Sequence, residues 1–174
     1  CIINNNRATS GGGITVSNSD ITIANSTFYH NSTTSESGGA LSSGSSDMVV
    51  VNCLFRNNSS AKYAGAIYAS VSTIKIINTT IVKNSASFGG GILLWSNTSA
   101  QIFNSVLWGN VAASDGDNLH VHTSNAYLSH TAIPSASSSI HVPSSTGATI
   151  SYDADSFAAS CKNLNNTNTE STGP

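Results

Sequence analysis

A motif of two asparagines six positions apart, with one large apolar residue midway, occurs four times in the sequence. The copies are NSTFYHN (25–31), NCLFRNN (52–58), NTTIVKN (78–84) and NSVLWGN (104–110). Their first asparagines are separated by 27, 26 and 26 residues, and a glycine-rich tetrapeptide precedes each copy. Self-similarity at a fixed period of this length indicates a chain built from stacked structural repeats.

Short stretches of alternating apolar residues lie between the glycines and the asparagines, and alternation predicts strands with one buried face. Residues directly after the glycines and midway in the asparagine motif supply two further apolar columns. We expect the interior to contain Ile21, Ile23, Met48, Val50, Ile74, Ile76, Ala100 and Ile102, with Ile14, Leu41, Ile67 and Ile92, and with Phe28, Phe55, Ile81 and Leu107.

A repeat of about 26 residues, with short strands and turns of Asn, Ser and Gly, predicts an all-β fold, a right-handed single-stranded parallel β-helix. No window has helical spacing over three turns, which excludes a helical solenoid. We expect roughly six coils in a β-helix domain over 1–160. The regular coils would span 11–133, degenerate closing coils would span 134–160, and 161–174 would be a polar tail or linker.

The asparagines are expected at the corners of each coil. Asparagine tolerates the left-handed backbone that a tight turn requires, and stacked asparagines can bond amide to amide along the axis. We therefore expect all eight to form ladders between coils: Asn25, Asn52, Asn78 and Asn104, and Asn31, Asn58, Asn84 and Asn110.

The composition excludes several classes of protein. Ser, Thr and Asn supply 70 of the 174 residues and charged residues only 8%, with aliphatic residues at regular positions, which argues against disorder. The net charge of −2 and the lack of a basic cluster argue against nucleic acid as a partner. No apolar run approaches the roughly 20 residues of a membrane helix. The chain begins at Cys1 without a methionine, so we expect a piece of a longer, processed protein.

Asp20 and Asp47 are the candidate catalytic pair. They occupy the same register in adjacent coils, so their Cα atoms would lie about 5 Å apart. Two clustered carboxylates can hydrolyse a glycosidic bond. However, the next coils have Thr73 and Ser99 at this position, and an aspartate before a strand commonly bonds the backbone of a turn. We expect a structural role, with a polysaccharide hydrolase or lyase as the alternative.

A metal site has weaker support. Asp115 and Asp117 alternate in SDGDN (114–118) as oxygen ligands of a hard cation would, but the later bidentate acid is missing. His120 and His122 share one strand face, which is a pattern that can bind Zn²⁺. His130 on the same coil falls in an asparagine register, where an imidazole can replace an amide. We expect an ordinary turn and neither a metal nor another cofactor.

Two groups of outward-facing apolar residues are candidates for a partner surface. One column holds Ala24, Val51, Ile77 and Phe103, and the wall after the glycines holds Tyr68, Leu93 and Trp95. An exposed apolar strip usually marks an interaction site. The alternative is that a loop or the C-terminal segment lies over it.

The cysteines are not expected to pair within the coils. Cys1 and Cys53 fall at equivalent positions two coils apart, so roughly 9–10 Å would separate their Cα atoms. A disulfide requires less than about 7 Å. Whether Cys161 pairs with either one stays open.

The glycine tetrapeptides and the Phe-x-x-Asn motifs at Phe28–Asn31 and Phe55–Asn58 resemble the repeats of chlamydial polymorphic outer membrane proteins. The resemblance covers about 11–133, and it is incomplete because Ile81 and Leu107 replace the phenylalanine. It implies a secreted or surface-displayed domain, often adhesive, and carries over no catalytic residues.

We therefore expect a non-catalytic module, secreted or on the cell surface, that acts as an adhesin or as a unit of an extracellular assembly. Its partner would be another protein, either a surface receptor or a second copy, or a glycan. The alternatives are a polysaccharide-degrading enzyme and a carbohydrate-binding rod.

Overall fold

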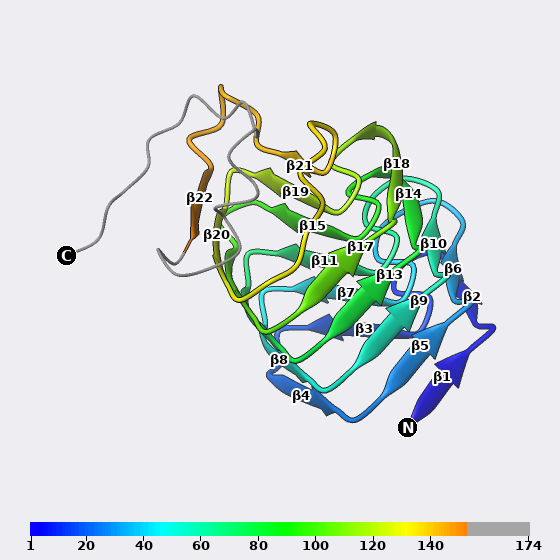
Figure 1. Ribbon diagram of the computed structural model, residues 1–174. Helices are drawn as coiled ribbons and strands as arrows, with labels where there is room; N and C mark the ends of the chain where they lie inside the picture. The colour runs from blue at the N-terminus through cyan, green and yellow to red at the C-terminus, as the bar shows by residue number, and fades with distance from the viewer. Residues whose placement is uncertain (153–174) are drawn as a thin grey trace.

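The computed structural model describes residues 1–152, in which 22 strands wind into a solenoid of about six coils (Figure 1). Four sheets, here called A to D, run along the stack, and each strand pairs in parallel with its equivalent in the next coil. Equivalent residues are typically 26 apart, as Ile74 and Ala100 are. The predicted parallel β-helix, its period and its approximate number of coils are confirmed.

The strands of each sheet follow one another along the axis. Sheet A contains β1 (Ile2–Asn4), β5 (Thr27–Tyr29), β9 (Leu54–Arg56), β13 (Thr80–Val82) and β17 (Val106–Trp108). Sheet B contains β2 (Arg7–Ala8), β6 (Ser32–Thr33), β10 (Ser59–Ser60), β14 (Ser85–Phe88) and β18 (Val111–Asp115). Sheet C contains β3 (Ile14–Ser17), β7 (Leu41–Gly44), β11 (Ile67–Ser70), β15 (Ile92–Trp95), β19 (Leu119–His122) and β21 (Ile140–His141). Sheet D contains β4 (Ile21–Ala24), β8 (Asp47–Val51), β12 (Thr73–Ile77), β16 (Ser99–Phe103), β20 (Asn125–Ser129) and β22 (Thr149–Tyr152).

Sheet B is the wall that the alternation of the sequence does not predict. In its middle coils it is only two residues long and consists of serine and threonine, as in β6 and β10. Serine and threonine give no alternation of apolar and polar residues, so the sequence does not predict strands here. These segments become strands because they pair with their equivalents in the neighbouring coils.

The predicted inward columns form the core. The inward residues of sheets A, C and D are buried from the second to the fifth coil, among them Leu41, Ile74 and Ile81. Phe28 and Phe55 stack in parallel, with ring centroids 4.6 Å apart. Such a pair stabilises the fold by about 1 kcal/mol beyond its buried area.

The first asparagine of each motif is a turn residue and not part of a ladder, which corrects the prediction for half of the eight. These residues have left-handed backbones and exposed side chains, and their side-chain amides make no hydrogen bond to any part of the chain from 1 to 152. Their φ angles are +49° at Asn25, +53° at Asn52, +49° at Asn78 and +47° at Asn104. His130 takes the same conformation at +49°. Asparagine is suited here because it tolerates positive φ at low cost.

The second asparagine of each motif forms a continuous ladder. The side-chain oxygen of Asn58 accepts bonds from the backbone N–H and the Nδ2 of Asn31, both at 3.0 Å. Asn84 accepts the same pair from Asn58, and Asn110 accepts it from Asn84. Each amide also donates to a buried backbone carbonyl, as Asn84 does to Phe55 at 3.1 Å. The buried amides therefore satisfy backbone groups as well as one another.

This ladder continues beyond the predicted residues at both ends. Asn6 donates to Asn31 at 2.9 Å below it, and Asn110 donates to Asn118 at 2.7 Å above it. Asn118 in turn donates to Ser139 at 2.9 Å. Asn118 is only eight residues beyond Asn110, so the 26-residue period does not reveal its place.

A column of hydroxyl groups holds the corner before sheet D in the same way. The backbone N–H of Ser46 donates to Ser72 Oγ at 3.2 Å, and the N–H of Thr98 donates to Ser124 Oγ at 3.2 Å. Each hydroxyl also donates back to a nearby carbonyl, as Ser72 does to Ser70 at 2.8 Å. The abundant serine and threonine thus supply caps for turn N–H groups that would otherwise be unpaired.

The last coil is incomplete. Sheets C and D gain a sixth strand, whereas sheets A and B end at the fifth. The closing coil contributes only Ala132 to sheet A, through a bridge to Val106. The domain limits in 134–160 and the tail over 161–174 remain predictions, because 153–174 lie outside the described residues.

Cys1 and Cys53 are free thiols, one exposed and one buried. They stand at equivalent positions two coils apart, because Cys1 is level with Ser26 and Ser26 with Cys53. Cys161 lies outside the described residues. Within 1–152, the structure contains no helix of the length and apolar character needed to cross a membrane.

Candidate functional sites

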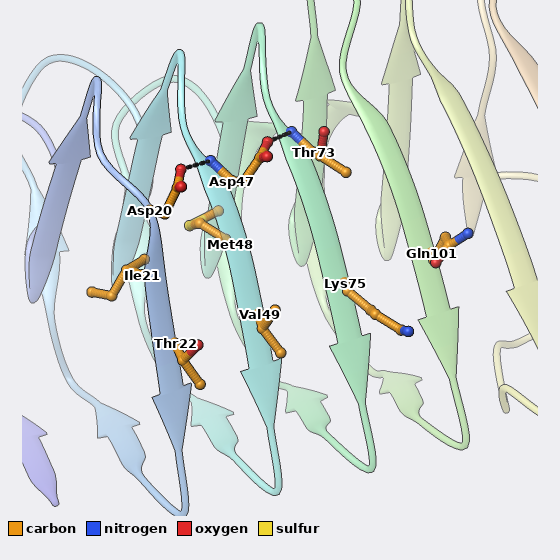
Figure 2. Close-up of a pocket in the computed structure, with 9 residues that line it drawn as sticks. All are labelled: Asp20, Ile21, Thr22, Asp47, Met48, Val49, Thr73, Lys75 and Gln101. Carbon is orange, nitrogen blue, oxygen red and sulfur yellow. Dashed lines mark hydrogen bonds between the residues drawn. The ribbon is translucent and has the colours of Figure 1, made fainter.

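Asp20 and Asp47 line an open groove of about 390 Å³ on the outer face of sheet D (Figure 2). Asp20 directly precedes β4 and Asp47 begins β8, so the register places them side by side in adjacent coils. The groove is lined by Asp20, Ile21, Thr22, Asp47, Met48, Val49, Thr73, Lys75 and Gln101.

Both carboxylates of the groove bond the backbone of the next coil. Asp20 Oδ1 accepts from the N–H of Asp47 at 3.3 Å, and Asp47 Oδ1 accepts from the N–H of Thr73 at 3.3 Å. Lys75 extends away from them, with its ammonium 5.7 Å from the centre of the Phe103 ring (Figure 2). The two aspartates therefore sit as strand-start caps on an exposed wall, and no third acid lines the groove.

The four metal candidates are not brought together as a ligand set. Asp117 Oδ1 accepts the backbone N–H of Ala112 at 2.8 Å, and Asp115 lies 3.5 Å from Nδ1 of His141. His122 stacks on Trp95. No cluster of three or more His, Cys, Asp or Glu side chains within 1–152 is placed to hold a metal ion.

His120 is buried on the outer side of sheet C. It is 5% exposed, and neither ring nitrogen has a hydrogen-bond partner among the described residues. Its ring centroid lies 4.8 Å from that of His141 and 6.1 Å from that of Phe88. Burial, followed by the proximity of His141, lowers the pKa of His120 from 6.5 to about 4, although the backbone and carboxylate of Asp115 act in the opposite direction. The imidazole is therefore neutral at pH 7.

A group of aromatic rings covers this wall, and we call Tyr63, Tyr68, Phe88, Trp95 and His122 the aromatic face of sheet C. Trp95 and His122 stack in parallel with centroids 3.8 Å apart. Tyr63 joins the group, with its ring 5.6 Å from Trp95, 5.9 Å from Phe88 and 6.3 Å from Tyr68. All five side chains are half-buried, so each ring presents part of its surface to solvent.

Leu93 does not belong to this exposed face, which corrects its prediction as a surface residue. In the register it lies between Tyr68 and His120, and its side chain is fully buried. The reason is that Tyr63 and Phe88, one residue before each glycine turn, add rings to the wall outside the sheet. Tyr68 and Trp95 themselves stay half-exposed.

The predicted apolar column on sheet D, which begins at Ala24 and ends at Phe103, is partly covered by its own neighbours. Val51, Ile77 and Phe103 are all half-buried, and only Ala24 is exposed. Phe103 meets Tyr127 of the next coil edge to face, with centroids 5.8 Å apart. This column has fewer exposed rings than the aromatic face of sheet C.

Tyr63 and Phe88 are the members of the aromatic face that sequence reasoning misses. Tyr63 lies in an irregular segment and Phe88 ends β14, and single bridges connect Ser37, Tyr63 and Phe88 in successive coils. Only their position in the sequence could have indicated them, because each residue directly precedes a glycine-rich tetrapeptide.

The comparisons with known proteins concern the fold. A family model described as a right-handed β-helix region matches residues 1–133. No similar sequence was found among curated proteins, and no similar structure was found among solved structures.

Proposed function

This chain belongs to the right-handed β-helix family, and we propose that it is a non-catalytic member that binds a partner through the aromatic face of sheet C. The observation that carries the proposal is the contiguous group of half-exposed rings around the Trp95–His122 stack. Tyrosine and tryptophan supply large, rigid contact area with a polar tip, and they are enriched at binding interfaces.

The sheet makes this surface rigid. Tyr68, Trp95 and His122 stand on paired strands, so the parallel register sets the spacing of their rings. Lys62 adds a cation 4.7 Å from the centre of the Tyr63 ring. A preorganised surface loses little conformational entropy when a partner binds.

We propose that the chain is non-catalytic because of how the two carboxylates of the groove on sheet D are bonded. General acid and base groups need a substrate held between them. Asp20 and Asp47 instead each accept a backbone N–H on an exposed wall.

We place this module in a secreted or cell-surface protein, as an adhesin or as a unit of an extracellular assembly. Support comes from a rod that is rich in Ser, Thr and Asn with only 8% charged residues, and from the likeness of its repeats to chlamydial outer membrane repeats. The partner is a second protein, including another copy of this chain, or a glycan.

Substituting Trp95→Ala and Tyr63→Ala tests the proposal. Loss of a central aromatic anchor costs about 2 kcal/mol, so we expect binding roughly 30-fold weaker. Glycan arrays with the purified chain measure one class of partner, and sedimentation over a range of concentrations measures self-association. Tyr127→Ala on sheet D is the matched control. Glycan binding or self-association that survives both substitutions unchanged would contradict the proposal.

The second candidate function is cleavage of a polysaccharide, by a hydrolase or a lyase reaction, in the groove on sheet D. It is favoured by the open groove that crosses several coils and holds two carboxylates with Lys75. Turnover can be measured by release of reducing ends or of unsaturated products from a polysaccharide panel. If the native chain shows turnover that Asp20→Asn and Asp47→Asn abolish, the chain is an enzyme and the proposed non-catalytic function is wrong.

A further inference from the structure

Residues 134–147 cross the C-terminal end of sheet C, and we call this segment the closing strap (Figure 1). Only two of its residues, Ile140 and His141, belong to a strand, and this strand, β21, is the last of its sheet. Both residues are half-buried, and 135–138 are exposed. Segments with few paired residues and much exposed backbone open at a lower free energy than the rest of a fold.

The strap is bonded to the fifth coil through a short stretch of backbone. The N–H of Asp117 donates to the carbonyl of Ser138 at 2.7 Å. The N–H groups of Asn118 and Leu119 both donate to the carbonyl of Ser139, at 2.8 Å and 3.1 Å. Asn118 Nδ2 also donates to Ser139 Oγ at 2.9 Å. The amide protons of Asn118 and Leu119 therefore report whether the strap is closed.

The closed strap covers a buried imidazole. His141 of the strap is in register with His120, and their ring centroids lie 4.8 Å apart, nearer than the 6.1 Å to Phe88 or the 6.2 Å to His122. His120 is 5% exposed, and neither of its ring nitrogens makes a hydrogen bond within the described chain. A buried polar group without a hydrogen bond favours any conformation in which water reaches it.

The charged and titratable groups that face His120 come from three strands. They are Asp115 on β18, His122 on β19 and His141 on β21, and Asp115 Oδ1 lies 3.5 Å from Nδ1 of His141. The side chains that β14 and β15 place beside the ring are apolar. Asp115 favours a proton on His120, whereas burial and His141 oppose it more strongly. The closed arrangement therefore holds the ring in its neutral form.

We propose that residues 134–147 are an acid-sensitive strap, which opens when His120 takes up a proton while the earlier coils stay folded. Opening brings the imidazolium into water and separates it from His141, and two protonated rings this close repel one another. It also leaves β19 as an unpaired strand edge. No strap residue belongs to the aromatic face of sheet C, so this device goes beyond the proposed function and does not depend on it.

Amide hydrogen exchange of the intact chain, followed by NMR at pH 7.5 and pH 4.5 and corrected for intrinsic rates, tests the proposal. The pKa of His120 is about 4 in the closed state and 6.5 in water, so below pH 6.5 the open state binds a proton that the closed state does not. The protection of the Asn118 and Leu119 amides should therefore fall roughly 70-fold between the two pH values.

The reference is the amide of Ile67, which donates to the carbonyl of Gly91 at 3.1 Å in the middle of the stack. At pH 4.5 exchange at Asn118 and Leu119 should depend little on urea, as a local opening does, whereas exchange at Ile67 should follow global unfolding. Protection at Ile67 also shows that each variant is folded.

His120→Leu removes the group that binds the proton, so Asn118 and Leu119 should be equally protected at both pH values. His141→Gln keeps that group but removes the second imidazole, and it should reduce the pH effect without abolishing it. His30→Gln, the control at an exposed histidine outside the strap, should preserve the full effect. Strap protection that does not change with pH, or that changes only with the urea dependence of Ile67, would overturn the proposal. So would a full pH effect in folded His120→Leu.

Discussion

At the scale of single residues, asparagine performs two different tasks in one motif. Asn78 is exposed with a φ of +49°, whereas Asn84 is buried and bonds three residues of the neighbouring coils. The chemistry of the side chain is the same, but only burial makes its hydrogen bonds costly to lose.

Asn84→Ala should therefore destabilise the protein far more than Asn78→Ala. The first change leaves buried groups of Asn58 and Phe55 unpaired, which costs about 3 kcal/mol at roughly 1–3 kcal/mol for each group. The second loses only the left-handed preference of asparagine, about 1 kcal/mol. Urea unfolding measures both, and equal shifts of the midpoint would show that the ladder does not stabilise the stack.

The glycine turns depend on backbone proximity between coils. A Cβ atom on Gly65 would lie 2.2 Å from the carbonyl oxygen of Gly90, and one on Gly39 would lie 2.2 Å from that of Gly65. Neither contact can be relieved by turning a side chain, because the obstructing atom belongs to the backbone.

Gly65→Ala should accordingly destabilise the protein by about 3 kcal/mol, at the upper end of overpacking. Gly44→Ala is the matched control, because a Cβ there meets nothing within 4 Å. Thermal unfolding of the two variants decides the point. A Gly65→Ala variant as stable as Gly44→Ala would mean that the coils can separate locally at little cost.

At the scale of elements, β21 closes sheet C through only two residues, and its His141 pairs in register with the buried His120 of β19. Three elements bring titratable groups to this site: β18 with Asp115, β19 with His122, and β21 with His141. Phe88 of β14 packs against the ring and is neutral. Neither ring nitrogen of His120 makes a hydrogen bond within the described chain, and the ring is buried.

The protein should lose stability as the pH falls from about 6.5 to about 4. Above pH 6.5 His120 is neutral in both states, and between these values only the unfolded chain binds the proton because the folded pKa is about 4. The full difference corresponds to about 3 kcal/mol, and it is complete below pH 4. Urea unfolding at pH 7.5 and pH 4.5 measures it, with hydrogen exchange of residues 139–142 as a local probe.

His120→Leu should remove most of this pH dependence, because a leucine of similar volume needs no partner and binds no proton. The exposed His30 supplies the control as His30→Gln, which should leave the dependence intact. An unchanged slope of stability against pH in His120→Leu would assign the acid sensitivity to other groups.

At the scale of the whole molecule, the predicted coils are confirmed because their signal is local. The 26-residue period and the inward positions of Ile74 and Ile76 follow from side-chain alternation and turn residues within each repeat. Sheet B and the extension of the ladder through Asn118 could not be predicted in this way, since each depends on a neighbouring coil.

The sequence by itself determined the repeat, the residues that face the core, and the number of coils. Only the tertiary structure decided which outward residues meet solvent. Leu93 is buried because rings from Tyr63 and Phe88 gather on its wall, and Trp108 is uncovered because sheet A ends at β17. The physical reason is that exposure depends on contacts between coils and on where the stack stops, and neither property is written in any single repeat.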